Sequence, residues 1–206
     1  MREETFENTE NIENEFVENE KVFENTKISD LKLKKIKLIN NEYKMIKFSN
    51  CEILNATFEN AYFMNSTFEN CNFSNTIFEN SSFKNCNFNN CKMEGCNFSD
   101  SSIIGGKFIE TILMYSNFSK SSIKDILFFD VNFNGAIFQE NEINNVEFQK
   151  VNLKQSQFFH TSLKNIDLSM SNIEELAISI DDIKGAIIEQ TQSVDLMYLL
   201  GVKFKY

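Results

Sequence analysis

The chain has 206 residues, a formal net charge of −10, 22 phenylalanines and five cysteines, and it contains neither proline nor tryptophan. Its length is that of one or two domains, and no apolar run approaches the ~18 residues of a membrane-spanning helix. The first 15 residues are acidic and lack the apolar segment of a secretory signal. These properties exclude an integral membrane protein and predict a cytoplasmic one whose cysteines stay reduced.

Residues 1–20 form the most acidic segment, with eight acidic residues and one arginine. Because this segment carries −7 of the total charge of −10, the rest of the chain carries only −3. Its apolar residues Phe6, Ile12 and Phe16 do not follow the spacing found further along. We predict an acidic N-terminal arm over 1–20, with its few apolar side chains packed against the start of the main domain.

A repeat of five residues begins at Phe23 and runs to Ile188 without insertion or deletion. All 34 positions reached by this step are apolar, and 17 of them are phenylalanine. Such self-similarity at a fixed period is the signature of a solenoid. We call these positions the centres of the repeats, and we predict a repeat domain over 21–190.

The residue two before each centre is mostly Ala, Cys, Ser, Thr, Val or Gly; from Cys51 to Ser171 the exceptions are Ile126, Asn141 and Ile166. A small and a large inward position separated by one polar residue is the alternation of a short strand. A five-residue step would reverse the inward face of a straight strand. The chain must therefore turn a corner within every repeat.

The corner is predicted two residues after each centre. This position is Asn at nine successive repeats, from Asn50 to Asn90, and Gly at four others. Asn and Gly tolerate the positive φ that a tight turn requires. The residues that flank the centres are mostly Glu, Lys, Asn and Ser, and we expect them to face solvent.

The five-residue step ends after Ile188, and a different pattern follows over 191–206. A helix is predicted from about Gln192 to Leu200, with Thr191 or Ser193 as its N-cap and Gly201 after its C-terminus. Val202, Phe204 and Tyr206 alternate with lysines as in a short strand. Because a solenoid needs its open end covered, we interpret this segment as a C-terminal cap.

No residue pattern in the chain indicates catalysis, a metal or a cofactor. The single histidine, His160, falls at a predicted corner, with no nucleophile or carboxylate pair nearby. The cysteines all occupy the small inward position, where Ser, Thr and Ala stand in other repeats. A metal cluster or a redox pair is the alternative to small buried filler, and filler is favoured because ligand spacing is absent. These cysteines are Cys51, Cys71, Cys86, Cys91 and Cys96.

Two sets of outward residues are candidates for a partner surface. Four glutamates stand out because Glu59 and Glu79 are twenty residues apart, with Glu69 on the opposite side and Glu52 nearby. Ile109, Leu127 and Phe129 flank centres, with Ile112, Met114 and Tyr115 beside them, and a group of outward apolar side chains marks a possible contact.

Stretches such as CNFSN, TIFEN, CNFNN, CNFSD and VNFNG resemble the unit of the pentapeptide-repeat family, and the pattern covers about 165 residues. The resemblance implies an all-β fold, a right-handed quadrilateral β-helix with four repeats, or twenty residues, in each coil. The repeats would then make about eight and a half coils, a rod of roughly 40 Å at ~4.8 Å a coil.

The C-terminal segment KGAIIEQTQSVDLMYLLGVKF is similar to the tail of the Qnr group of quinolone-resistance proteins and of their mycobacterial relatives. The likeness rests on Gln190, Leu196, Leu199 or Leu200, Gly201 and Val202. It implies a homodimer through the C-terminal cap and a rod that imitates duplex DNA. The residues expected at the dimer contact are Leu196, Met197, Leu199, Leu200, Val202 and Phe204.

The partner implied by this resemblance is a type II topoisomerase, DNA gyrase or topoisomerase IV, with an effect on fluoroquinolone susceptibility. In this interpretation the protein is no enzyme, uses no cofactor, and binds neither nucleic acid directly nor a membrane. The alternative is a structural or interaction scaffold for an unrelated protein, bound through the apolar residues between Ile109 and Phe129.

Overall fold

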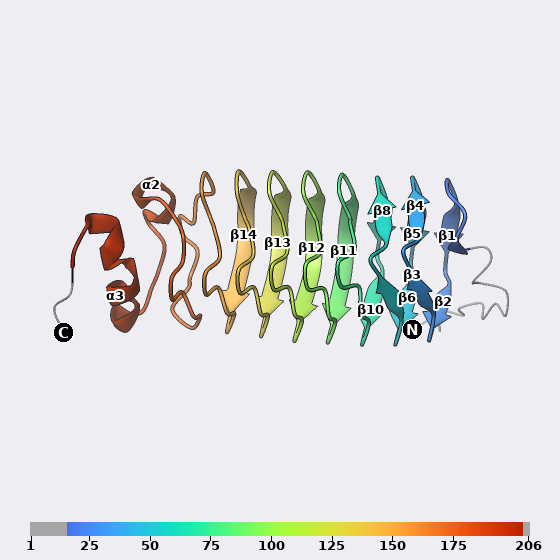
Figure 1. Cartoon of the computed structure of the whole chain (residues 1–206), viewed down its shortest axis with the longest axis horizontal. Coiled ribbons are helices and arrows are strands. Elements are labelled where there is room, and N and C mark those ends of the chain that lie inside the picture. The colour runs from blue at the N-terminus through green and yellow to red at the C-terminus, as the bar shows by residue number, and fades with distance from the viewer. Residues whose placement is uncertain (1–15, 204–206) are drawn as a thin grey trace.

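The chain forms a straight rod of stacked coils with a helical segment at one end (Figure 1). This computed structural model describes residues 16–203. In that part of the chain no helix is long and apolar enough to cross a membrane. The predicted fold class, an all-β solenoid of pentapeptide coils with a C-terminal helical segment, is confirmed.

The strands are three residues long in the first coils and eight residues long in the later ones. The short strands are β1 (Val22–Glu24), β2 (Lys27–Ser29), β3 (Lys32–Lys34), β4 (Lys37–Ile39), β5 (Glu42–Lys44), β6 (Lys47–Ser49), β7 (Glu52–Leu54), β8 (Thr57–Glu59), β9 (Tyr62–Met64) and β10 (Thr67–Glu69). The long strands are β11 (Ser82–Asn89), β12 (Ser102–Ile109), β13 (Ser122–Phe129) and β14 (Glu142–Gln149).

All pairings are parallel and join residues twenty positions apart, so each coil contains four repeats. On one side of the rod a single column of such partners passes through eight coils: Lys37, Thr57, Ile77, Asn97, Asn117, Ile137, Gln157 and Ala177. On this side of the rod the backbone groups of each coil are thus satisfied by the coils before and after it. The five-residue period predicts the corners, and the register between coils makes the rod four-sided.

Corners occur where the sequence predicts them. Every fifth residue from Glu20 to Asn165 has a positive φ. The asparagines among them also pair across coils: the side-chain amide of Asn90 donates to that of Asn70 at 2.8 Å, and Asn85 donates to Asn65 at 3.1 Å. Asparagine therefore supplies both the backbone conformation and a lateral link. The series of positive φ values is interrupted at Met170.

The core consists of aromatic columns that run along the rod. Thirty of the 34 centres are buried, and the remaining four are partly buried. Phe88 stacks between Phe68 and Phe108, with ring centroids 4.4 Å away on both sides. Rings in neighbouring columns meet edge to face, as Phe78 and Phe83 do at 5.5 Å. Stacked and edge-on contacts are both favourable for aromatic rings.

At the N-terminal end, Phe16 covers the first coil. Its side chain is completely buried and lies 5.5 Å from the ring of Phe23 and 5.7 Å from that of Tyr43. This is the packing expected of the arm's apolar residues. Phe6 and Ile12 lie outside the described residues.

The C-terminal cap is made of short helical turns: α2 (Ile180–Ile183), η1 (Gln190–Gln192), α3 (Ser193–Leu196) and η2 (Met197–Leu200). Helical turns cover Gln190–Leu200, close to the predicted span from about Gln192 to Leu200. The predicted N-cap, Thr191 or Ser193, is wrong, because Glu189 forms a capping box with Gln192 and begins the first turn. The buried Gln192 amide also donates to the carbonyls of Leu168 and Ser171, which ties this turn to the last coils.

Two further details of the cap differ from the sequence analysis. The turn α2 was not predicted; it forms because the Ser179 hydroxyl accepts a hydrogen bond from the Asp182 amide. Gly201 has φ +69° at the end of η2, as expected. Val202 is not in a strand, and Phe204 and Tyr206 lie outside the described residues.

We predict that Phe88→Ala lowers the free energy of unfolding by ~3–5 kcal/mol, because it removes a ring from the middle of a stacked column. Asn89→Ala is the matched control, since the adjacent Asn89 side chain points outward. It should change stability by less than about 0.5 kcal/mol. Urea denaturation followed by circular dichroism measures both, and equal losses would contradict the inward and outward assignment.

Candidate partner-binding surface

The four glutamates proposed as a partner surface lie on the outside of the rod, and three of them face lysines. Glu52 pairs with Lys34 at 3.6 Å, and Glu59 with Lys37 at 3.9 Å. Glu69 is 2.8 Å from Lys47. All three lysines come from the preceding coil. Among residues 16–203 no ion pair involves Glu79.

These pairs change the electrostatic character expected of the glutamates. Glu59 and Glu79 do follow one another on one face, since Thr57 and Ile77 are cross-coil partners. However, the lysines neutralise part of the charge near three of the four carboxylates. Exposed pairs of this kind contribute ~1 kcal/mol or less to stability, so their main effect is on the surface potential.

Ile109, Leu127 and Phe129 lie together on one face, as predicted, and we call them the apolar cluster. Ile109 and Phe129 are direct cross-coil partners on β12 and β13, and Leu127 stands two residues before Phe129 on the same strand. All three side chains are half-buried. The ammonium group of Lys150 lies 5.4 Å from the centre of the Phe129 ring, a cation–π distance.

The apolar surface continues around the corner from this cluster. Ile112 and Tyr115 are 39% and 59% exposed, and Met114 between them is half-buried. Ile109 of the apolar cluster flanks the centre Phe108, and Ile112, Met114 and Tyr115 belong to the next repeat of the same coil. The two faces therefore present apolar groups on both sides of the corner at Glu110.

The C-terminal residues predicted at a dimer contact divide into two sets. Leu196 and Leu199 pack against the core of the last coil and so act as the cap itself. Leu200 is 68% exposed and Val202 is 40% exposed, which leaves them available for a second molecule. Met197 is half-buried. Phe204 lies outside the described residues.

The cysteines are all buried and none forms a disulfide. Burial raises the pKa of the Cys86 and Cys96 thiols to about 12. In the column of Cys51, Cys71 and Cys91, the contact with Cys71 raises the pKa of Cys51 and lowers that of Cys91. Within the described chain no three His, Cys, Asp or Glu side chains are grouped to hold a metal ion.

His160 occupies a corner with φ +57°, and its backbone amide donates to Asp182 at 3.0 Å. Its side chain is exposed, in agreement with the expectation of a turn residue. Nothing in its contacts pairs it with a nucleophile. Neither the histidine nor the cysteines form a reactive arrangement in the part of the chain described.

We predict that the thiols react with an aromatic disulfide reagent at pH 8 at least about a hundredfold more slowly in the folded protein than in urea. The reason is that the thiolate is the reactive form, and burial both excludes the reagent and keeps the thiols of Cys86 and Cys96 protonated. Absorbance of the released thiol measures the rate. Rapid labelling of any cysteine in the native protein would contradict the filler interpretation.

Sequence reasoning missed one surface feature, an opening between β14 and residues 162–169. The cavity there has a volume of about 720 Å³. Two signals pointed to it: Asn141 and Ile166 were exceptions at the small inward position, and Met170 stands at a corner where Asn or Gly is usual.

Residues 42–108 match the family model described as a pentapeptide repeat region. The match covers the coils with the most regular asparagine corners, and it confirms the predicted resemblance to that family. A sequence comparison with curated proteins finds no match.

Among solved structures, a trypsin-treated form of QnrB1, described as a plasmid-mediated fluoroquinolone resistance protein, aligns at 21% identity and a TM-score of 0.46, over 91% of this chain and 99% of its own. Full-length QnrB1 aligns at 18% identity and a TM-score of 0.35, over 90% and 99%. HetL, a pentapeptide repeat protein involved in heterocyst differentiation regulation from the cyanobacterium Nostoc sp. strain PCC 7120, aligns at 11% identity and 0.28, over 83% and 86%.

Proposed function

Starting from a rod that contains a pentapeptide repeat region, we propose that this chain acts without catalysis, by binding a protein partner along the side of the rod. The observation that carries the proposal is the apolar cluster. On faces lined mainly by Asn, Ser, Lys and Glu, Ile109, Leu127 and Phe129 expose apolar surface on adjacent strands. A rimmed apolar patch on a polar surface is typical of a protein contact.

The partner that we propose to test first is a type II topoisomerase, DNA gyrase or topoisomerase IV. The support is the similarity of the C-terminal segment to the tail of the Qnr group, together with the acidic character of the chain. A rod that imitates DNA would present carboxylates where a duplex presents phosphates. Glu79, which has no ion pair among the described residues, and Glu59 beside it are the carboxylates that would do so on one face.

An unrelated protein partner is the second candidate, and a specific observation favours it. Lysines from the preceding coil accompany Glu52, Glu59 and Glu69, which lowers the negative potential that a DNA mimic needs. The apolar cluster requires no acidic partner surface to be useful, since aromatic and aliphatic anchors dominate most protein contacts.

A homodimer through the C-terminal cap is part of the proposal. Val194 in α3, Tyr198 and Leu200 in η2, and Val202 after these turns are all exposed. These apolar groups exceed what the cap needs for its own packing. Two copies joined at this end would double the length of the side surface available to a partner.

We predict that the purified protein inhibits supercoiling by DNA gyrase or protects it from ciprofloxacin-stabilised cleavage. Glu59→Gln with Glu79→Gln should weaken this effect by about tenfold or more if the carboxylates replace phosphates. Gln139→Ala, further along the same face, is the matched control and should leave the effect unchanged. A protein without effect on gyrase, with or without the drug, rules out this partner.

Leu127→Glu with Phe129→Glu tests the apolar cluster in the same assay and in partner capture. The double variant should lose the contact, because a buried carboxylate without a partner is costly at an interface. Asn87→Glu with Asn89→Glu, two coils earlier on the same face, is the control. The side-binding proposal fails if the protein has no effect on gyrase and the double variant captures the same partners, in the same oligomeric state, as the unchanged protein.

We predict that Leu200→Lys converts a dimer to a monomer, because it places charge in an apolar contact between two caps. Sedimentation equilibrium measures the mass directly. Thr191→Lys, on an exposed part of the cap, is the control and should not change the mass. A monomeric unchanged protein at micromolar concentration would remove the dimer from the proposal.

A further inference from the structure

The coils are not joined equally well all along the rod: β14 has a strand partner on only one side. It pairs with β13 in parallel register, and no strand follows it in the sheet among residues 16–203. In the residues that follow, 162–169, no backbone bond reaches back to β14. The edge of β14 that faces residues 162–169 is called the open edge here.

Two regular series of backbone hydrogen bonds end at this point. The first joins the residue after the small position on one face, such as Ser102 or Ser122, to the coil before, and it stops with Glu142, whose amide donates to Ser121 at 3.0 Å. The second joins the corner amides of one column, such as Asn90 and Glu110, to the next coil, and it stops with Asp130, whose amide donates to Gln149 at 3.0 Å. The next members would be the Asn141 carbonyl and the Lys150 amide. Neither has a backbone partner in the described chain.

The other two faces continue without a break. Asn152 pairs with Asn172, and Gln157 with Ala177, in the usual register. Residues 162–169 instead pair forward, as Asp167 does with Ile187. At this point the coils are therefore joined by backbone pairing on two faces of the rod and separated on the other two.

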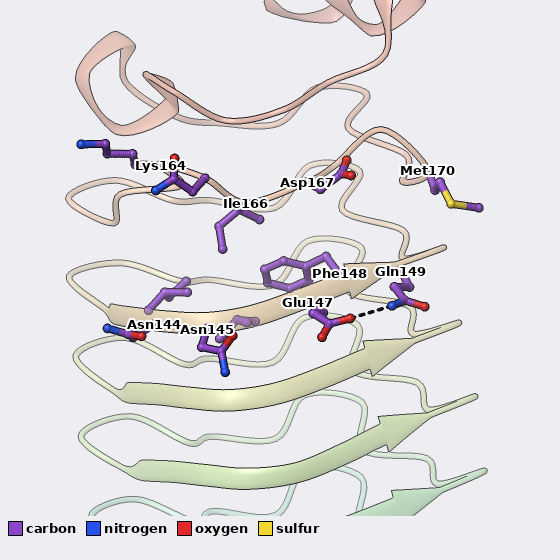
Figure 2. Close-up of a pocket in the computed structure, with 12 residues that line it drawn as sticks. Asn144, Asn145, Glu147, Phe148, Gln149, Lys164, Ile166, Asp167 and Met170 are labelled. Atoms are coloured by element: carbon purple, nitrogen blue, oxygen red, sulfur yellow. Dashed lines mark hydrogen bonds between the residues drawn. The ribbon is translucent and has the colours of Figure 1, made fainter.

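The opening is a cavity of about 720 Å³ between β14 and residues 164–170. Figure 2 shows Phe148 and Ile166 between the two coils, with Glu147 and Asp167 on opposite sides of the gap. Met170, where the series of positive φ values is interrupted, lines the same cavity and is 66% exposed.

Cys86, Gly106, Ile126, Val146 and Ile166 occupy the same small position in successive coils. Ile126 and Val146 pair in regular register between β13 and β14. Among the described residues the next member, Ile166, has no such pairing with β14. The regular stacking of this column therefore ends between Val146 and Ile166.

The charges at this point disfavour close pairing of the two coils. Glu147 and Asp167 occupy equivalent positions one coil apart, and no ion pair involves either of them in the described residues. Glu147 accepts a hydrogen bond from Gln149 at 2.7 Å, and Asp167 accepts one from the Ser169 amide at 2.9 Å. We call these two carboxylates the acidic lip. Like charges directly opposite each other destabilise strand pairing.

We propose that the open edge binds an extended peptide segment that carries basic side chains, which adds to β14 as a further strand. The free backbone groups at Asn141 and Lys150 supply main-chain hydrogen bonds, as in other cases of strand addition. The apolar side chains of Ile143 and Ile166 face the apolar positions of the segment. The acidic lip selects Lys or Arg at the alternate positions. This site is independent of the apolar cluster and of the proposed function.

The probe is an acetylated, fluorescein-labelled peptide of alternating Val and Lys, eight residues long, titrated into the full chain and followed by fluorescence anisotropy. We expect saturable binding. The same peptide N-methylated at alternate residues keeps its charge but cannot donate along one edge, and it should bind at least about tenfold more weakly. Equal binding of both peptides would mean that charge alone attracts the probe, which would overturn the proposal.

A charge reversal tests the acidic lip. In Glu147→Lys with Asp167→Lys, the Val/Lys peptide should lose at least about tenfold in affinity, and a Val/Glu peptide should gain by a similar factor. Glu79→Lys with Asp100→Lys introduces the same charge elsewhere on the rod and should leave both affinities within about twofold. If both double variants behave alike, the lip does not form the site.

Hydrogen exchange of the backbone amides tests whether the edge of β14 is open. In the free protein the Lys150 amide should exchange at least about a hundredfold faster than the Asp130 amide, its bonded equivalent one coil earlier, and the peptide should slow it selectively. Equal protection of both amides before peptide is added would show a closed edge. A variant shortened to end at Gly201 tests whether the chain's own C-terminus occupies the edge. If the peptide binds this variant but not the full chain, residues 202–206 are the occupant and the proposal of a partner peptide fails.

Discussion

Backbone hydrogen bonds in a register of twenty residues hold each coil to its neighbours, and the rest of the structure depends on this register. It places every centre above an earlier centre and every corner above an earlier corner. Because the backbone is satisfied along the axis of the rod, the side chains are free to divide into inward and outward sets. Phenylalanine is so frequent because flat rings can stack at the spacing that the backbone imposes.

The same register governs the surface. Charges on successive coils are brought within a few ångströms of one another, so a lysine in one coil meets a glutamate in the next, as Lys47 meets Glu69. Where two residues of like charge follow each other, as Glu147 and Asp167 do, the coils lack that attraction. Surface chemistry in such a rod is therefore a property of columns of residues, and a single substitution changes the environment of two neighbours.

A rod of this kind has little concave surface away from its irregularities, so function must come from its faces, its ends or its breaks. The apolar cluster belongs to a face, the exposed apolar residues around Leu200 to an end, and the open edge of β14 to a break. Each would recognise a different kind of surface: an apolar protein patch, a second copy, or an extended basic segment. None of the three requires a catalytic group.

The five-residue period by itself determined the inward centres, the small fillers and the corners, because these follow from local backbone geometry and side-chain size. It also located the apolar cluster, since Ile109, Leu127 and Phe129 break a polar pattern. Only the tertiary structure decided what lies beside what. The lysines opposite Glu52, Glu59 and Glu69 and the opening at β14 depend on contacts between coils. A period of five does not specify those contacts, because they require the number of sides and the packing of residues twenty apart.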